Sequence, residues 1–136
     1  LIQMGVTFIT HSDTEVVLHT LRVFGEKGLE KLTGMFALIF VDLTEKSVLI
    51  ARDKNGEKPL YYAQNPDTLI ISSECQAIQK LKNSALDTKQ LEPYFYFRAP
   101  FPGNTFFKGI HEWKPERYSK LLSHSALYRN SAKWWR

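Results

Sequence analysis

The longest uninterrupted apolar run in this sequence covers residues 35–41, from Met35 to Val41. Its β-branched and aromatic content favours a strand over a helix, and apolar residues at every position indicate a strand that is covered on both faces. The run is much shorter than the roughly 20 residues that a membrane-spanning helix needs. We therefore expect a central strand inside a layered fold, and no membrane partner.

Three more short strands are expected at hairpin spacing after this run, over residues 47–51, 59–63 and 68–72. Asn-Gly and Asn-Pro pairs between them are typical of turns. The four strands together predict an antiparallel meander. Covering a central strand on both faces needs two layers, or more sheet than these strands supply, so part of the fold is expected to be absent.

The start of the chain predicts a strand over residues 6–10 that leads directly into a helix. Ser12 and Glu15 have the Ser-x-x-Glu spacing of a capping box, in which each side chain satisfies a backbone donor. The helix should run to about residue 24, because Gly25 is well placed to end it. A short helix over residues 27–32 is expected next.

Two later helices follow the strands. The capping pattern that begins at Ser73 predicts a helix to about residue 81, and Asp87 is expected to cap another over residues 88–97. Beyond Arg98 a loop rich in proline and glycine leads into segments of weak periodicity, which predict no particular structure. The whole reads as one α+β unit, because we find no repeat or clear linker before Lys114.

Composition limits the function classes. The 136 residues are 43% hydrophobic, which is enough for one domain with a real core. The single cysteine, Cys75, excludes an internal disulfide and fits a reducing compartment, and no leader directs secretion, so we expect a cytoplasmic location. Because the first residue is Leu1, we expect the N-terminus to be incomplete.

The basic excess lies in the last third, where residues 82–136 contain 10 Lys and Arg against 4 Asp and Glu. Such a bias could serve nucleic acid, a phosphate-bearing ligand or an acidic neighbouring domain. The basic residues are scattered singly, however, and a solvated surface is the preferred interpretation. The late aromatic residues could stack on bases, but core and interface packing explains them equally well: Phe106, Phe107, Trp113, Tyr118, Tyr128, Trp134 and Trp135.

Asp13 is the residue that the capping box leaves unexplained. A carboxylate in the first turn of a helix is favoured by the helix dipole, so Asp13 could be merely stabilising, or it could bind the ammonium group of a ligand.

Three other candidate groups have a preferred structural interpretation or no site pattern. Arg52 and Asp53 could anchor the turn that contains Gly56, or hold a phosphate; the structural interpretation is preferred. Cys75 could be activated at a helix start, but a core position is favoured. The four histidines show no metal-ligand spacing.

Four ordered motifs together resemble the class II glutamine amidotransferases. They are Ser12-Asp13-Thr14-Glu15-Val16, Gly34-Met35-Phe36-Ala37, Ala51-Arg52-Asp53 with Gly56 and Lys58-Pro59-Leu60-Tyr61-Tyr62-Ala63, and Ser72-Ser73-Glu74. Phe107-Lys108-Gly109-Ile110 and Trp134-Trp135 are similar to the asparagine-synthetase branch. The resemblance implies a partial αββα sandwich of the N-terminal-nucleophile hydrolase type, with mostly antiparallel strands. It also implies a glutaminase domain over residues 1–113 and a connection over 114–136 toward an absent synthetase domain.

In such enzymes an N-terminal cysteine attacks the side-chain amide of glutamine and releases ammonia, and upstream asparagine and glycine groups form the oxyanion hole. None of these maps onto this chain, so the resemblance implies no catalytic residue here and no activity of this piece alone. Asp13 maps onto the residue that binds the α-ammonium group of L-glutamine. The resemblance gives structural roles near the site to the remaining matches: Ser12, Glu15, Arg52, Asp53, Gly56 and Glu74.

The parent protein is accordingly expected to be a glutamine-hydrolysing asparagine synthetase that amidates aspartate. No cofactor or metal is expected in this segment, whereas ATP and Mg belong to the absent synthetase domain; homodimerisation is left open and nucleic acid is not an expected partner. Asn55, Glu57 and the segment Pro115-Glu116-Arg117 depart from the family pattern and weaken the choice of acceptor. The alternative hypothesis is an inactive remnant that acts as a basic protein- or nucleic-acid-binding module.

Overall fold

The computed structural model describes residues 1–122 and 132–133. Three α-helices, three 3-10 helices and seven strands are assigned in this part of the chain. In chain order they are η1 (Ile2–Met4), α1 (Asp13–Phe24), η2 (Gly25–Lys31), β1 (Ala37–Asp42), β2 (Ser47–Arg52), β3 (Tyr61–Gln64), β4 (Leu69–Ser72), α2 (Cys75–Lys82), η3 (Thr88–Gln90), α3 (Leu91–Phe97), β5 (His111–Glu112), β6 (Arg117–Leu122) and β7 (Ala132–Lys133).

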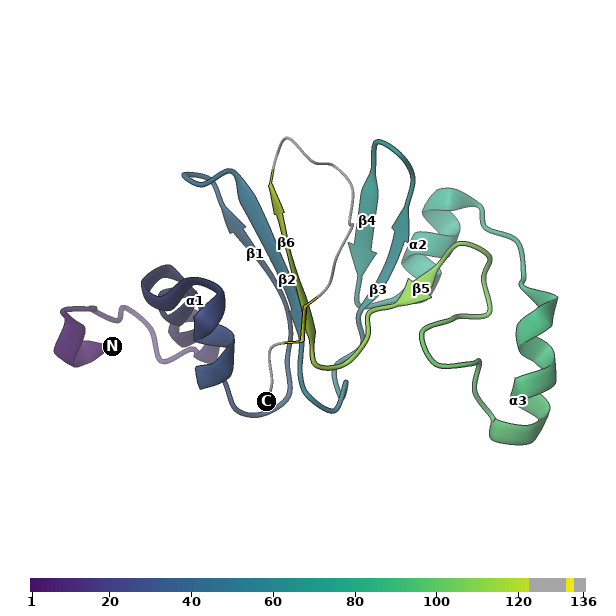
Figure 1. The fold of residues 1–136 in the computed structure, drawn as a ribbon, viewed down its shortest axis with the longest axis horizontal. Coiled ribbons are helices and arrows are strands. Elements are labelled where there is room, and N and C mark those ends of the chain that lie inside the picture. The colour runs from purple at the N-terminus through teal and green to yellow at the C-terminus, as the bar shows by residue number, and fades with distance from the viewer. Residues whose placement is uncertain (123–131, 134–136) are drawn as a thin grey trace.

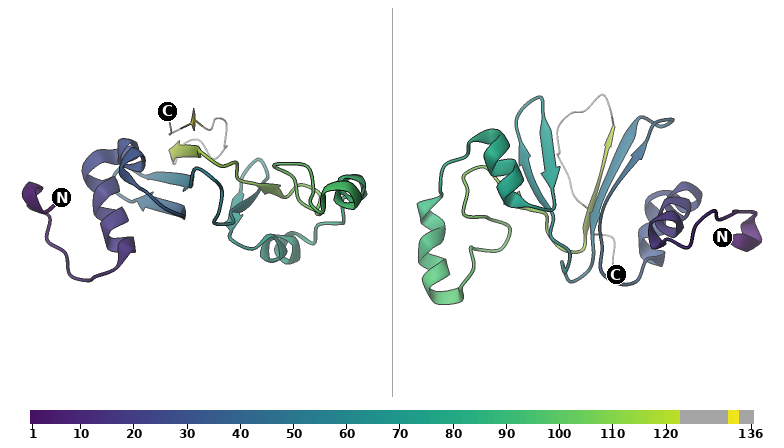
Figure 2. Two further views of the ribbon diagram at one scale, coloured as in Figure 1. Left: turned by 90° about the horizontal axis from the view of Figure 1, so that it is seen from below. Right: turned by 180° about the vertical axis from the view of Figure 1, so that it is seen from behind.

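The strands form two antiparallel sheets. One has the order β1-β2-β6-β7 and the other has the order β4-β3-β5. Helix α1 lies on the outer side of the first sheet and α2 on the outer side of the second, so the layers follow the order helix, sheet, sheet, helix (Figure 1; Figure 2). The expected α+β class and αββα sandwich are thus confirmed.

Three apolar clusters hold the four layers together. The first joins α1 and η2 to the first sheet through Leu21, Leu29 and Leu49. The second lies between the sheets around Ile50, Leu60 and Trp113, and the third joins α2 to the second sheet around Ala63, Ile78 and Ile110. Each sheet therefore has apolar residues on both of its faces, which explains why apolar and polar residues alternate so little along the strands.

The sequence locates β1, β2, β3 and β4, but it predicts none of β5, β6 and β7 and is wrong about how the strands pair. The expected meander is instead two hairpins in different sheets, because β2 pairs with β6 and β3 pairs with β5 rather than with each other. The apolar run at residues 35–41 was expected to form a central strand, yet β1 lies at the end of its sheet as described. Ile39 and Val41 keep 47% and 56% of their surfaces exposed, while Leu38 and Phe40 pack against the α1 cluster.

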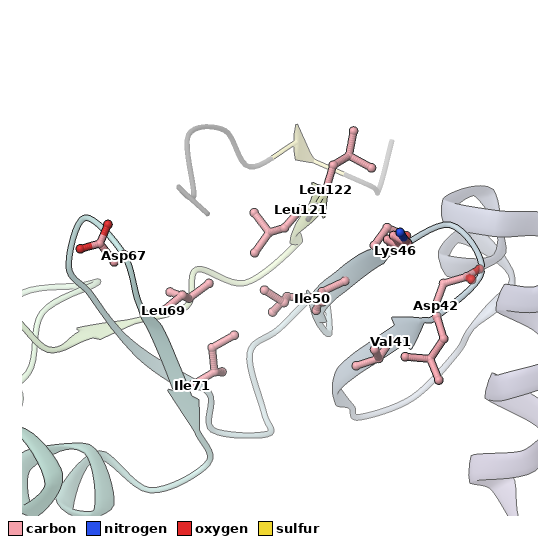
Figure 3. Close-up of a pocket in the computed structure, with 12 residues that line it drawn as sticks. Val41, Asp42, Lys46, Ile50, Asp67, Leu69, Ile71, Leu121 and Leu122 are labelled. Atoms are coloured by element: carbon pink, nitrogen blue, oxygen red, sulfur yellow. The ribbon is translucent and has the colours of Figure 1, made fainter. Parts of the chain in front are cut away.

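An apolar groove opens where the two sheets diverge. It has a volume of about 460 Å³ and is lined from the first sheet by Val41, Ile50 and Leu121, and from the second by Leu69 and Ile71 (Figure 3). Val41, at the end of β1, faces this groove, which accounts for the exposure of its side chain.

The expected strand over residues 6–10 is also wrong, because this segment forms no strand in the structure. Within residues 1–122 and 132–133 no strand pairs with this segment, and the backbone N–H groups of Ile9 and Thr10 donate instead to Glu15 of α1. Helix α1 ends as expected, since the Gly25 N–H donates to Leu21 O. No helix of the described residues has both the length and the apolar content for crossing a membrane.

Candidate functional site

The start of α1 is organised by Glu15. Its carboxylate accepts hydrogen bonds from the backbone N–H groups of Ile9 at 2.8 Å and Thr10 at 2.7 Å, and also from the Thr10 hydroxyl. The Thr10 hydroxyl lowers the pKa of Glu15 most, and the two backbone N–H donors follow. Together they bring this pKa from 4.5 to about 2. Glu15 therefore stays ionised and fixes the segment that leads into the helix.

The predicted capping box is half right. Ser12 is the N-cap residue, but its hydroxyl accepts from Thr14 N at 3.2 Å, two residues on, rather than from Glu15 N. Glu15 reaches past Ser12 to Ile9 and Thr10, because those donors would otherwise lack a strand partner. His19, one turn later, lies 3.6 Å from the Glu15 carboxylate and stacks edge-on against Phe8. These contacts are those of a structural residue that supports the start of α1.

Asp13 lies exposed on the first turn of α1, beside this network. Its Oδ1 accepts from Thr14 N at 2.8 Å, whereas within residues 1–122 and 132–133 no hydrogen bond to Oδ2 is found. One oxygen therefore fixes the side chain and the other faces solvent at the positive end of the helix dipole. The arrangement can accept a hydrogen bond from a cationic ligand group.

Arg52, at the end of β2, is buried, and every nitrogen of its guanidinium donates a hydrogen bond. Its guanidinium donates to the carbonyl oxygens of Gly56, Lys58 and Trp113, and to Oε1 of Glu112 at 2.8 Å. Each of these acceptors lies in the turn after β2 or at β5. Arg52 therefore anchors the turn and also joins it to the second sheet, where Glu112 belongs to β5.

Asp53 is buried beside it and caps the same turn from the other side. Its carboxylate accepts from the backbone N–H groups of Phe36, Asn55, Glu57 and Lys58 at 3.0–3.3 Å. Burial tends to raise the pKa of Asp53, but these four donors outweigh it and the net pKa is lowered. The preferred structural role of Arg52 and Asp53 is consistent with this bonding.

Gly56 is required by both conformation and space. Its φ of +67° lies in the left-handed region, and a Cβ atom there would come within 2.7 Å of Pro115 and 3.1 Å of the Arg52 guanidinium. Glu116, in the segment that departs from the family pattern, also has a positive φ of 57° and donates its N–H to Asp53 O. A glutamate thus occupies a backbone conformation that favours glycine.

Glu74 and Cys75 lie at the start of α2. Glu74 is the N-cap residue by position, but its side chain makes no capping hydrogen bond, and its N–H donates to the Ser72 hydroxyl. The capping box that begins at Ser73 is therefore wrong. Cys75 packs against Ala63, Ile78 and Ile110, the cluster between α2 and the second sheet. Burial, together with the charge of Glu74, raises the pKa of the Cys75 thiol. This fits the core position expected for Cys75.

The structure thus places the candidate residues at three positions: Ser12, Asp13 and Glu15 at the start of α1, Arg52, Asp53 and Gly56 in the turn after β2, and Glu74 at the start of α2. Sequence reasoning missed Glu112, which carries no local signal because its partner Arg52 is 60 residues away. Trp113 is buried between the sheets rather than available for stacking on bases. His124, Tyr128, Trp134 and Trp135 lie outside the described residues.

No cluster of three or more His, Cys, Asp or Glu residues that could hold a metal ion occurs in residues 1–122 and 132–133. Besides Glu15, Asp53 and Cys75, the half-buried tyrosines Tyr61 and Tyr118 have altered pKa values, which burial raises.

Comparisons with known proteins identify the family of this chain. Residues 1–135 match the family model described as glutamine amidotransferase domain. The chain is 38% identical over 95 residues to asparagine synthetase [glutamine-hydrolyzing] 1 of Bacillus subtilis, covering 69% of this chain and 15% of that protein. It is 32% identical over 134 residues to asparagine synthetase [glutamine-hydrolyzing] 3 of the same organism, covering 96% of this chain and 21% of that protein.

The fold is similar to a solved structure, the glutamine phosphoribosylpyrophosphate amidotransferase from B. subtilis. The TM-score is 0.65 at 20% identity, over 98% of this chain and 25% of the other. The chain therefore spans about a fifth of the length of the asparagine synthetases that it matches. The family model covers nearly every residue and does not favour the alternative of a basic binding module. The chain belongs to the glutamine amidotransferase family.

Proposed function

We propose that this chain is part of a glutamine-dependent asparagine synthetase, in which it contributes to the glutamine hydrolysis that supplies ammonia for ATP-dependent amidation of aspartate. Its similarity to two asparagine synthetases of B. subtilis supports the proposal. Because the chain spans only about a fifth of their length, the ligase activity is assigned to the complete protein.

The observation that carries the proposal is the placement of Asp13. Its carboxylate is fixed through Oδ1 at the start of α1, while Oδ2 faces solvent. A carboxylate held in this way suits the α-ammonium group of L-glutamine, since charge-assisted hydrogen bonds are short and strong. Asp13 is therefore the proposed substrate-binding residue, and the Glu15 network is proposed to hold it in position.

The proposed organisation places the glutaminase part at residues 1–113 and the connection to a synthetase domain at residues 114–136. Strand β6 lies in this second part and pairs with β2, so the connection would begin as a strand of the same sandwich. ATP and Mg would bind to the synthetase domain. The proposed location is the cytoplasm, and homodimerisation is a further proposal that gel filtration of the complete protein would test.

We also propose that the 136 residues alone do not hydrolyse glutamine. The one cysteine, Cys75, packs in the cluster between α2 and the second sheet, and its raised pKa disfavours the nucleophilic thiolate. Asp13 is on α1, outside the other sheet (Figure 1). Ammonia release from glutamine by the purified 136-residue chain would contradict this proposal.

Isotope tracing tests the proposed reaction in the complete protein. With glutamine labelled at the amide nitrogen, ATP, Mg and aspartate, the label should appear in the side-chain amide of asparagine. Replacing aspartate with glutamate is the matched control for the acceptor. Labelled free ammonia with no labelled asparagine would support the glutaminase role and refute the asparagine synthetase assignment.

A further inference from the structure

The hydroxyl of Thr10 lies at the centre of the hydrogen bonds that precede α1. It donates to Oε2 of Glu15, and it accepts from the backbone N–H of Ser12 at 3.2 Å. The backbone N–H of Thr10 donates to the same Glu15 oxygen at 2.7 Å. One hydroxyl group therefore joins the segment before the helix to a carboxylate in the first turn and also to the N-cap residue.

Ser12 connects Thr10 to Asp13, the next residue in the chain. The Ser12 hydroxyl accepts from Thr14 N at 3.2 Å, and the same N–H donates to Asp13 Oδ1 at 2.8 Å. Ser12 is thus held at its backbone N–H by Thr10 and at its side chain by Thr14. Because the ends of helices fray, these hydrogen bonds limit how far the Asp13 carboxylate can move.

Packing against the sheets does little to hold this segment. Thr10, Ser12 and Asp13 are exposed, and the chain before α1 lies on the side of that helix away from the sheets (Figure 1; Figure 2). Water can replace the hydrogen bonds of an exposed hydroxyl, so its removal should change stability little. The same removal would, however, release the backbone of the residue that precedes Asp13.

We propose that Thr10 is a positioning residue for glutamine binding, which acts by fixing Ser12 and thereby the carboxylate of Asp13. This inference rests on the proposed function. Charge-assisted hydrogen bonds have specific geometry, and a displacement of about 1 Å can weaken recognition strongly. Thr10 acts through Asp13 and does not contact the ligand. Loss of its hydroxyl should therefore weaken glutamine binding and leave the chemical step unchanged.

The position requires a hydroxyl group rather than a β-branched shape. The pKa of Glu15 is about 2, so at neutral pH it is a carboxylate that needs donors. A threonine or serine hydroxyl can donate to this carboxylate and accept from the Ser12 N–H at the same time. Valine has nearly the shape of threonine and can do neither. Valine and serine at residue 10 therefore separate the two properties of the side chain.

Steady-state kinetics of glutamine hydrolysis by the complete protein test the proposal. The variants are Thr10→Val, Thr10→Ser and a matched control, Thr44→Val, at an exposed position of the β1–β2 turn. We expect Thr10→Val to raise KM for glutamine roughly 5- to 20-fold with kcat within about twofold of the wild type, because ground-state and transition-state binding are weakened equally. Thr10→Ser and Thr44→Val should match the wild type.

Three results of this comparison would overturn the proposal. They are an unchanged KM for glutamine in Thr10→Val, a raised KM in Thr10→Ser, and a loss of folding in Thr10→Val. The last result would show that the hydroxyl supports the structure as a whole, and thermal unfolding detects it. We expect the unfolding midpoint of Thr10→Val to lie within about 3 °C of the wild type.

The double variant Thr10→Val/Asp13→Asn shows whether Thr10 acts through Asp13. If it does, the KM of the double variant for glutamine should equal that of Asp13→Asn within about twofold, whereas independent effects would multiply and overturn the proposal. If Asp13→Asn alone leaves this KM unchanged, the proposed substrate-binding role of Asp13 fails together with this inference. If Asp13→Asn raises KM and Thr10→Val does not, only the inference about Thr10 fails.

Discussion

Arg52 Nη1 donates a 2.8 Å hydrogen bond to Glu112 Oε1, and this ion pair joins the end of β2 in one sheet to β5 in the other. The same guanidinium donates to the carbonyl oxygen of Trp113, and the side chain of Trp113 is buried between the sheets. The turn after β2 is therefore both a local structure and the link that sets how the sheets meet.

Replacing Arg52 with methionine should destabilise the protein by about 3 kcal/mol or more, because the substitution leaves buried carbonyl groups and Glu112 without their donor. Urea unfolding measures the loss. Arg22→Met, at an exposed position of α1, is the matched control and should change stability by less than about 0.5 kcal/mol. Similar small effects at both positions would refute the central role of Arg52.

Gly56→Ala should cost about 2–3 kcal/mol, because the new Cβ atom combines left-handed strain with a close contact to Pro115. Gly109 has a similar φ of +70°, but no atom lies within 4 Å of its Cβ position. Gly109→Ala therefore isolates the conformational term and should cost about 1 kcal/mol. Thermal or urea unfolding of the two variants compares them, and equal losses would show that packing around Gly56 is unimportant.

Glu15 should contribute to stability in a pH-dependent way. Its pKa is about 2 in the folded protein against an ordinary value of 4.5, so the unfolded chain binds the proton more readily. The contribution is present above pH 4.5 and is lost as the pH falls toward 2. Glu15→Gln should therefore lower the urea midpoint at neutral pH and have a much smaller effect near pH 2. Glu45→Gln, at an exposed turn position, is the control, and a difference that grows in acid would contradict the prediction.

Cys75→Ala in the complete protein should leave the rate of glutamine hydrolysis within about twofold of the wild type. The thiol packs against the α2 cluster, and its raised pKa keeps it protonated. A glutaminase assay measures the effect, with thermal unfolding as a control for the lost contact. Abolished hydrolysis in a variant that still folds would identify Cys75 as a catalytic nucleophile.

Local signals in the sequence predicted the ends of α1 and the start of η3, but not the way in which α2 begins. Ser12 and Gly25 set the ends of α1, and Asp87 accepts from Lys89 N in the η3 turn that precedes α3. These residues act on donors and acceptors within a few positions, so their spacing is sufficient. The motif around Asp13 could be found in the same way, although its role as a glutamine-binding residue stays a prediction.

The arrangement of the strands could not be predicted from local signals. β2 pairs with β6 and β3 pairs with β5, and both partners lie far along the chain, where no local pattern indicates them. The strand over residues 6–10 failed for a related reason, since its alternating pattern carries no information about whether a neighbouring strand exists. Glu15 satisfies two of its backbone donors instead.

The most direct test of the account is the choice of nitrogen donor by Asp13→Asn in the complete protein. Removing the charge that we assign to the α-ammonium group of glutamine should lower kcat/KM for glutamine roughly 10- to 100-fold. Asparagine formation from free ammonia should be unchanged, and Asp67→Asn, an exposed aspartate in the β3–β4 turn, should retain both activities. Equal loss with glutamine and ammonia, or no loss with glutamine, would contradict the assignment of Asp13 as the glutamine-binding residue.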